Sequence, residues 1–344
     1  ALVYALLKYE FLVLYPVNPK QLARFRETLT PSGAKDDPSD ARLLLKLLET
    51  HRDCLRPWLP EDPKTRLIRQ LVEDRRALVD RRTRLVNTLK SRLKQYYPLA
   101  LQLHSDLASP VACALLLRCS SLEELQQADP QEITDFYQQQ HCFRPVLIAQ
   151  RLERIAHAAP LVTDPAILHS GRLCVRSLAA ELASRFEPLA EYDRQLAALT
   201  ESHPDGKLFR SFPGAGPALA PRLLAAFGAD RERIASAEQM QSFSGIAPVT
   251  VKSGKQHRVQ RRWACNKFLL QTFHEFACHS IRFSAWAQAY YDMMIARGKK
   301  RPAAIRALAF KWIRILFRCW KSGKPYDEAS YFQSLYKRQS PLLK

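Results

Sequence analysis

The spacing of leucines constrains the fold of this chain more than any other pattern. Leucines recur at intervals of seven residues across 71–85 and again across 182–196, with further apolar residues at intervals of four. Charged residues occupy the other faces. Heptad spacing of this kind is typical of helices that pack along their length. We therefore predict two long helices, near 64–97 and 173–203, that pack as an antiparallel hairpin or coiled coil.

These helices would form the middle one of three domains. Residues 61–205 are predicted to be a helical coiled-coil region, in which residues 98–165, with many Gln and several Pro, form shorter helices. The heptad spacing is compatible with two roles. Each helix is either one amphipathic member of a bundle or part of a dimer contact. Ten glycines against twenty-two prolines favour a mainly α fold that is broken at proline-containing turns.

Positive charge is concentrated at the C-terminal end. Residues 250–344 contain ten Lys and ten Arg but two Asp and two Glu, which leaves +16 of the chain's net charge of +20. Such a concentrated field is typical of a protein that binds polyphosphates. It argues against a structural helical dimer whose charge serves solubility alone. We therefore predict a basic, mostly helical domain over residues 206–344.

Two classes of protein are disfavoured by composition. No run of about eighteen apolar residues occurs, so no membrane span is expected. The eight cysteines are scattered without a C-x-x-C pair, which argues against a zinc ribbon or a disulfide framework. This cysteine usage fits a reducing cytoplasm.

The first sixty residues predict part of an α/β domain. Phe11–Tyr15 is a short apolar run of the kind found in covered parallel strands, and an amphipathic helix is expected over Val3–Glu10. One strand and two helices cannot make a sheet alone. We therefore expect either that earlier strands precede Ala1 or that another element completes the domain.

Asp37 and Asp40 stand three residues apart at a predicted helix start. Asp37 is expected to cap the helix, because Pro38 follows it at the first helical position. Both carboxylates then lie on the same face of the first turn. Capping with favourable placement at the helix dipole is the better explanation of the pair. The alternative is a divalent-metal site, in which paired carboxylates supply oxygen ligands to Mg²⁺.

One nucleophile-capable side chain lies in a short loop of the basic region. Ser253 belongs to the predicted loop Val251–Lys255, between helices expected near 238–244 and 263–280. A basic surface that merely holds nucleic acid explains this segment, and a serine that attacks a phosphodiester is the alternative. The cations around the serine are Lys252, Lys255, Arg258, Arg261 and Arg262.

Two further features of the basic region point to phosphates. Phe212–Gly228 resembles a helix-hairpin-helix element, in which Gly214 and Gly216 would let backbone N–H groups reach a phosphate, although tight helix packing also explains the glycines. A helix predicted near 303–321 carries a basic stripe opposite its apolar face. The cations of this stripe and of the segment before it are Lys299, Lys300, Arg301, Lys311, Arg314, Arg318 and Lys321.

Several short segments occur in an order that is specific in combination. They are Ala1–Lys20, Ser32–Ala41, Pro213–Gly216, Phe243–Pro248 and Lys252–Gly254. Together they resemble bacterial insertion-sequence transposases of the IS110 type. These proteins are DEDD recombinases, some of which are guided by a bridge RNA.

The resemblance implies a three-part protein. A RuvC-like, ribonuclease-H-type α/β domain over residues 1–60 would bind Mg²⁺ through four acids, a coiled coil would mediate dimerisation, and a transposase domain would carry a nucleophilic serine. Matched by motif, Asp37 and Asp40 are the last two acids and Ser253 is the nucleophile. The first Asp and the Glu would lie on strands before Ala1. The chain is therefore expected to be an N-terminally truncated member with at most half of the metal site.

The function implied by the resemblance is that of a DNA recombinase of an insertion sequence in the bacterial cytoplasm. It would cut and rejoin DNA through the serine, aided by the metal-binding acids. The implied partners are DNA, a structured guide RNA and further copies of the chain in a homodimer or tetramer. A catalytically defective remnant that only binds nucleic acid is the alternative.

Overall fold

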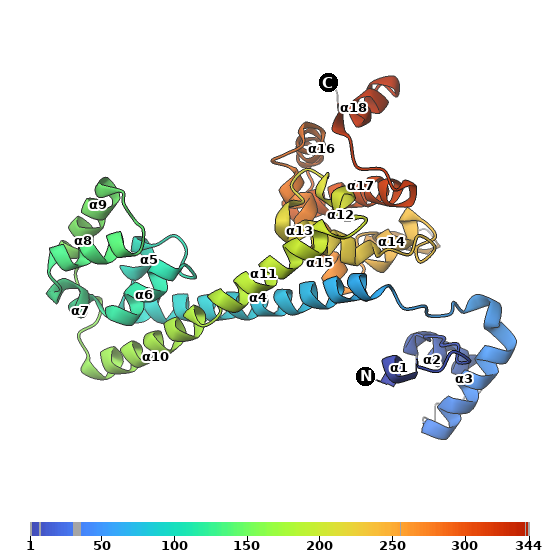
Figure 1. Cartoon of the computed structure of the whole chain (residues 1–344), viewed down its shortest axis with the longest axis horizontal. Helices are drawn as coiled ribbons and strands as arrows, with labels where there is room; N and C mark the ends of the chain where they lie inside the picture. The colour runs from blue at the N-terminus through green and yellow to red at the C-terminus, as the bar shows by residue number, and fades with distance from the viewer. Residues whose placement is uncertain (1, 7, 30–35, 255, 341, 343–344) are drawn as a thin grey trace. The chain divides into compact units, whose positions relative to one another are not determined.

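Helices make up most of the chain, as the sequence predicts (Figure 1). The structure is a computed structural model that describes residues 2–6, 8–29, 36–254, 256–340 and 342. It divides into two compact units, residues 1–62 and 63–344. Among the described residues the only strands are β1 (Val249–Ser253) and β2 (Gln256–Gln260), which form one antiparallel hairpin.

The first unit contains helices joined by extended chain. The predicted strand Phe11–Tyr15 is wrong, because this segment is irregular and no described residue of the unit offers it a strand partner. Its apolar side chains are largely uncovered, and Phe11 is 81% exposed. The segment is held instead where the Trp58 N–H donates to the Leu14 carbonyl over 2.7 Å. The helices are α1 (Leu2–Leu6), α2 (Pro19–Leu29), α3 (Asp37–His51) and the 3₁₀ turn η1 (Arg52–Cys54).

The cap of α3 lies one residue earlier than predicted. Asp36 has extended backbone angles, and its carboxylate accepts the N–H of Ser39 over 2.8 Å. Asp37 is therefore the first helical residue rather than the cap. Pro38 fits behind it because the first turn of a helix needs no donor there. Asp37 and Asp40 both lie in the first turn, as predicted.

The predicted helical hairpin is present in the second unit. Two consecutive helices lie side by side with one long helix and run back along it (Figure 1). The returning arm is broken into two helices near residue 184. A continuous helix would need the N–H of residue 188 to bond to the Ser184 carbonyl, and Pro188 has no N–H. The three helices are α4 (Pro63–Tyr96), α10 (Pro165–Ala183) and α11 (Phe186–Glu201).

The heptad leucines are used largely within one chain. Leu182, Leu189 and Leu196 are all buried. On α4, Leu89 and Leu93 are fully buried in the core that contains Leu182. Packing within a helical bundle therefore accounts for the burial of these leucines, and self-association stays a prediction.

Residues 98–165 form the predicted set of short helices, with a core of their own that α4 and α10 complete. Small polar residues begin several of these helices. Ser109 and Ser121, for example, accept backbone N–H groups of the first turn. The helices are α5 (Ala100–Leu103), α6 (Pro110–Arg118), α7 (Leu122–Gln127), α8 (Pro130–Gln139) and α9 (Pro145–Ala156).

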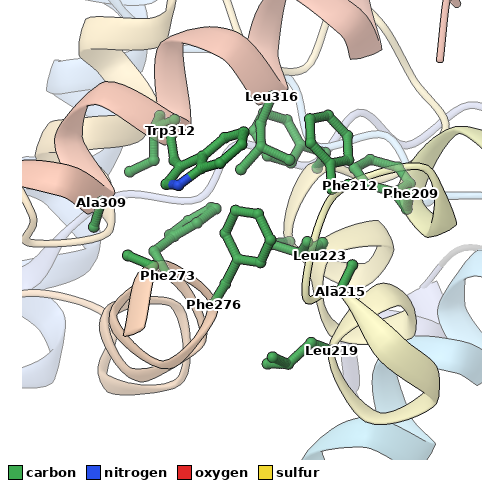
Figure 2. Packing of buried hydrophobic residues seen from close by; sticks show 14 of the residues in the cluster. Phe209, Phe212, Ala215, Leu219, Leu223, Phe273, Phe276, Ala309, Trp312 and Leu316 are labelled. Carbon is green, nitrogen blue, oxygen red and sulfur yellow. The ribbon is translucent and has the colours of Figure 1, made fainter. Parts of the chain in front are cut away.

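The C-terminal helices surround an aromatic core (Figure 2). Phe212 is buried in this core, with its ring centroid 6.1 Å from that of Trp312 and 5.3 Å from that of Tyr326. The buried Trp312 N–H donates to the Ser280 hydroxyl over 2.8 Å, so its polar atom is satisfied. The helices are α12 (Gly206–Arg210), α13 (Gly216–Phe227), α14 (Ala237–Phe243), α15 (Lys267–Ser280), α16 (Ala285–Ala296), α17 (Arg301–Ser322) and α18 (Glu328–Lys337).

None of the helices in the described residues combines the length and the apolar character that crossing a membrane requires.

Phe212 should carry much of the stability of the C-terminal helices. Phe212→Ala removes a buried ring from this core and should destabilise it by about 3–5 kcal/mol. Phe243→Ala is the matched control, because Phe243 is 54% exposed and its loss should cost less than about 0.5 kcal/mol. Urea unfolding followed by tryptophan fluorescence measures both. Equal effects of the two substitutions would contradict the packing described.

Acid should weaken the short-helix region through His104. Burial, with a contribution from Arg151, lowers the pKa of His104 to about 4. Because this pKa lies below that of an unfolded His, the stabilisation is complete above pH 6.5 and is lost as the pH falls toward 4. Between pH 7 and pH 5 the wild type should lose roughly 1–2 kcal/mol more than His104→Asn. Hydrogen exchange of peptides from 98–165, corrected for intrinsic rates, measures this, and identical losses would refute it.

Candidate nucleic-acid interface

The segment predicted as a loop around Ser253 is the end of a β-hairpin. Val249, Thr250 and Val251 favour extended chain, and β1 pairs with β2 from Val249 opposite Gln260 to Ser253 opposite Gln256. Gly254, with φ of +54°, permits the tight turn. The predicted loop is therefore wrong for 251–253, which are strand, and Lys255 lies outside the described residues.

The register of the hairpin decides which cations share a face with Ser253. Side chains alternate between the two faces of a strand, and paired residues share a face. Val251 pairs with Arg258, so Arg258 lies on the Ser253 face, as a diagonal neighbour about 7–8 Å away. Lys252 pairs with His257 on the opposite face. Proximity in sequence therefore does not place Lys252 beside the serine hydroxyl.

An exposed aromatic side chain follows the hairpin. Trp263 is 70% exposed, and the Arg261 guanidinium lies 5.0 Å from its ring centroid. Arg262, between them, is half-buried. A flat cation–aromatic pair on a basic surface is suited to stacking on bases. Sequence reasoning missed Trp263, although an aromatic residue amid cations was a usable signal.

The hairpin continues into a second cationic group. Burial lowers the pKa of Arg306 on α17, and the charge of Arg261 lowers it further. Burial also lowers the pKa of His274 on α15, and the charges of Arg306 and then Arg261 act in the same direction. The charges of Arg261 and Arg306 repel each other, and a bound anion would relieve this repulsion. Arg306 was not among the predicted interface residues.

The start of α17 presents the predicted cations to solvent. Lys299, Lys300 and Arg301 are exposed, and no ion pair within the described residues engages them. Lys300 is the N-cap residue and makes no capping hydrogen bond through its side chain. Cations at the positive end of a helix dipole are unfavourable by about 0.3–1 kcal/mol each. An anion bound at this end of the helix would therefore be stabilised by both the cations and the helix dipole.

The predicted basic stripe on α17 is not uniform. Arg314 and Arg318 are exposed. Lys311 is half-buried over the rings of Trp286 and Tyr290, at 5.4 and 4.8 Å, and burial lowers its pKa. Lys321, at the far end, forms an ion pair with Glu232 over 2.7 Å. The two arginines are therefore the most available cations of the stripe.

Gly214 lies in the turn before α13, and Gly216 is the first residue of that helix. Gly214 has φ of +76°, and a Cβ there would lie 3.1 Å from the backbone of His279 and Ser280. Tight packing therefore explains Gly214. The arginines that line the adjoining pocket include Arg75, Arg210 and Arg222, which are paired with Asp193, Glu201 and Glu275. Use of this turn as a phosphate site stays a prediction.

The predicted acidic pair lies in the first unit. Asp37 is exposed, whereas Asp40 is partly buried and forms an ion pair with Arg26. The described residues contain no group of three or more His, Cys, Asp or Glu side chains that could hold a metal. Two carboxylates leave most of an octahedral Mg²⁺ shell to water. Asp37 and Asp40 alone therefore do not fit a complete metal site.

Comparison with known proteins identifies two segments of the chain. Residues 1–98 match the DEDD transposase domain of the IS110 type, and residues 206–292 match the transposase domain of the IS116/IS110/IS902 family. Together the two matched segments span more than half of the 344 residues.

Two relatives that align with most of the chain agree with these matches. The "mini-circle putative transposase for IS117" of Streptomyces coelicolor is 28% identical over 94% of this chain and 79% of the relative. The "insertion element IS110 uncharacterized 43.6 kDa protein" of the same organism is 28% identical over 87% of this chain and 74% of the relative. The DEDD match also indicates dependence on a divalent metal. The chain therefore belongs to the IS110 family of transposases, enzymes that recombine DNA.

Proposed function

We propose that the chain cuts and rejoins DNA through Ser253. The observation that carries this proposal is the hairpin itself, which exposes Ser253 at the end of β1 with Arg258 on the same face. Gly254 follows without a side chain, so a DNA backbone can approach the serine closely. The remaining cations of the domain would bind flanking phosphates.

The proposed reaction is a transfer between two oxygen atoms. The Ser253 oxygen attacks phosphorus and loses its proton to solvent, and the bond from phosphorus to the leaving DNA oxygen breaks as that oxygen gains a proton. The resulting phosphoserine ester retains the bond energy, so a hydroxyl of another DNA end can reverse the step and rejoin a strand. Serine needs activation because its intrinsic pKa is high. Arg258 would stabilise the charge that develops on the phosphate.

We also propose that Asp37 and Asp40 contribute to a Mg²⁺ site in concert with acids outside the described pair. Arg26 would have to release Asp40 for this, since the two side chains form an ion pair.

Phosphate binding would extend over several parts of the C-terminal domain. The exposed cations Arg258, Arg261 and Lys299–Arg301 would hold DNA or a structured guide RNA chiefly through phosphates. Partly exposed leucines such as Leu67 and Leu173 remain available for contact with a second copy, in a homodimer or a tetramer. The net charge of +20 supports a polyanionic partner.

Ser253→Ala should abolish covalent attachment to DNA while leaving DNA affinity within about twofold, because one hydroxyl adds little to a phosphate-dominated interface. The substrate is DNA that spans the ends of the element carrying the gene, with Mg²⁺ present. Mass spectrometry of trapped protein–DNA adducts should locate a phosphoserine at residue 253.

Ser242→Ala is the matched control, since Ser242 belongs to the neighbouring helix α14 and not to the hairpin. It should retain wild-type attachment. Attachment that persists in Ser253→Ala, or a wild type that forms no adduct, would contradict the serine assignment.

A further inference from the structure

A groove between α17 and α18 has no role in the serine chemistry. It has a volume of about 770 Å³ and is lined by residues of both helices and of the segment that joins them. Hollows of this size accept compact ligands or short chain segments, whereas a double helix contacts broad surfaces. Whatever occupies the groove is therefore narrow.

The charge of the groove is strongly unbalanced. Its only lining carboxylate among the described residues is Asp327, which caps α18 by accepting the N–H of Ser330 over 3.0 Å and the N–H of Ala329 over 3.3 Å. No ion pair within the described part of the chain neutralises the lining cations. These cations are Lys311, Arg314, Arg318, Lys324 and Arg338.

Aromatic rings form part of the wall between these cations. The Tyr326 hydroxyl accepts the Trp286 N–H over 2.9 Å, which fixes the Tyr326 ring. Tyr331 packs against Trp286 with ring centroids 4.9 Å apart and remains half-buried. Aromatic rings beside exposed cations are the combination that binds single-stranded nucleic acid, because every base has a face that can stack.

We propose that the groove between α17 and α18 binds a short single-stranded segment of nucleic acid. Arg314 and Arg318 contact its phosphates from one wall, Lys324 and Arg338 contact them from the other, and Tyr331 stacks on a base. The inference rests on the proposed use of nucleic acid by this chain but not on Ser253. It assigns this face of the C-terminal domain to a strand that is separate from the phosphodiester at the hairpin.

The test measures how binding of a labelled single-stranded oligonucleotide to the full chain depends on salt. Each lost phosphate contact lowers the slope of log K against log salt by about 0.7 for single strands. Arg314→Ala combined with Arg318→Ala should therefore lower the slope by about 1.4 and weaken binding by at least tenfold at about 0.1 M salt.

Arg81→Ala combined with Arg84→Ala is the matched control. Both residues are exposed on α4, and the change in net charge is the same. The slope should not change in this variant. An equal loss in both double variants would show that only overall charge matters and would overturn the groove assignment.

Four further measurements complete the test. Ultraviolet cross-linking should attach the oligonucleotide to the peptide that contains Tyr331, and cross-links confined to the β-hairpin would refute the proposal. Duplex DNA should lose less affinity than the single strand in Arg314→Ala/Arg318→Ala. Poly-glutamate that competes as well as the oligonucleotide would reassign the groove to acidic peptides. Ser253→Ala should bind the oligonucleotide normally, so failure of the serine assignment is distinguishable from failure of this one.

Discussion

The packing of one long helix holds the second unit together. Ile68 and Val72 of α4 belong to the core of the C-terminal helices, whereas Leu89 and Leu93 belong to the core of the short-helix region. A helix of 34 residues is about 50 Å long, so it can take part in two separate cores. The α10 and α11 helices cover it between them. The C-terminal helices that carry the β-hairpin are thus built on the same long helix, α4, as the short helices of residues 98–165.

The leucine spacing predicted the helical hairpin of α4 with α10 and α11, because the spacing of apolar residues reports directly which side chains face a core. It could not predict the break before α11, which depends on the missing N–H of Pro188. The strand predicted at Phe11–Tyr15 failed for another reason. An apolar run becomes a strand only where a neighbour pairs with it, and pairing is a property of the whole domain rather than of the segment.

The sequence predicts the positive charge of the candidate interface, but it does not predict which cations lie on which face of the β-hairpin or of α17. The cations around Ser253 are evident from the sequence, yet the hairpin register alone puts Arg258 on the serine face and Lys252 on the other. Similarly, periodicity predicts the stripe on α17 without showing that Trp286 partly covers Lys311. Contacts between residues far apart in the sequence make these distinctions, so local patterns cannot supply them.

The proposed chemistry depends on Arg258 lying on the same face of the β-hairpin as Ser253. A comparison of two substitutions tests this placement most directly. Arg258→Gln and Lys252→Gln remove the same charge from paired strands, on opposite faces. The rate of covalent attachment at saturating DNA should fall by about 10²–10³-fold in Arg258→Gln, as expected for loss of a group that stabilises the transition state. In Lys252→Gln that rate should stay within about threefold, with only weaker DNA binding. Equal loss of rate in both variants, or a larger loss in Lys252→Gln, would contradict the arrangement.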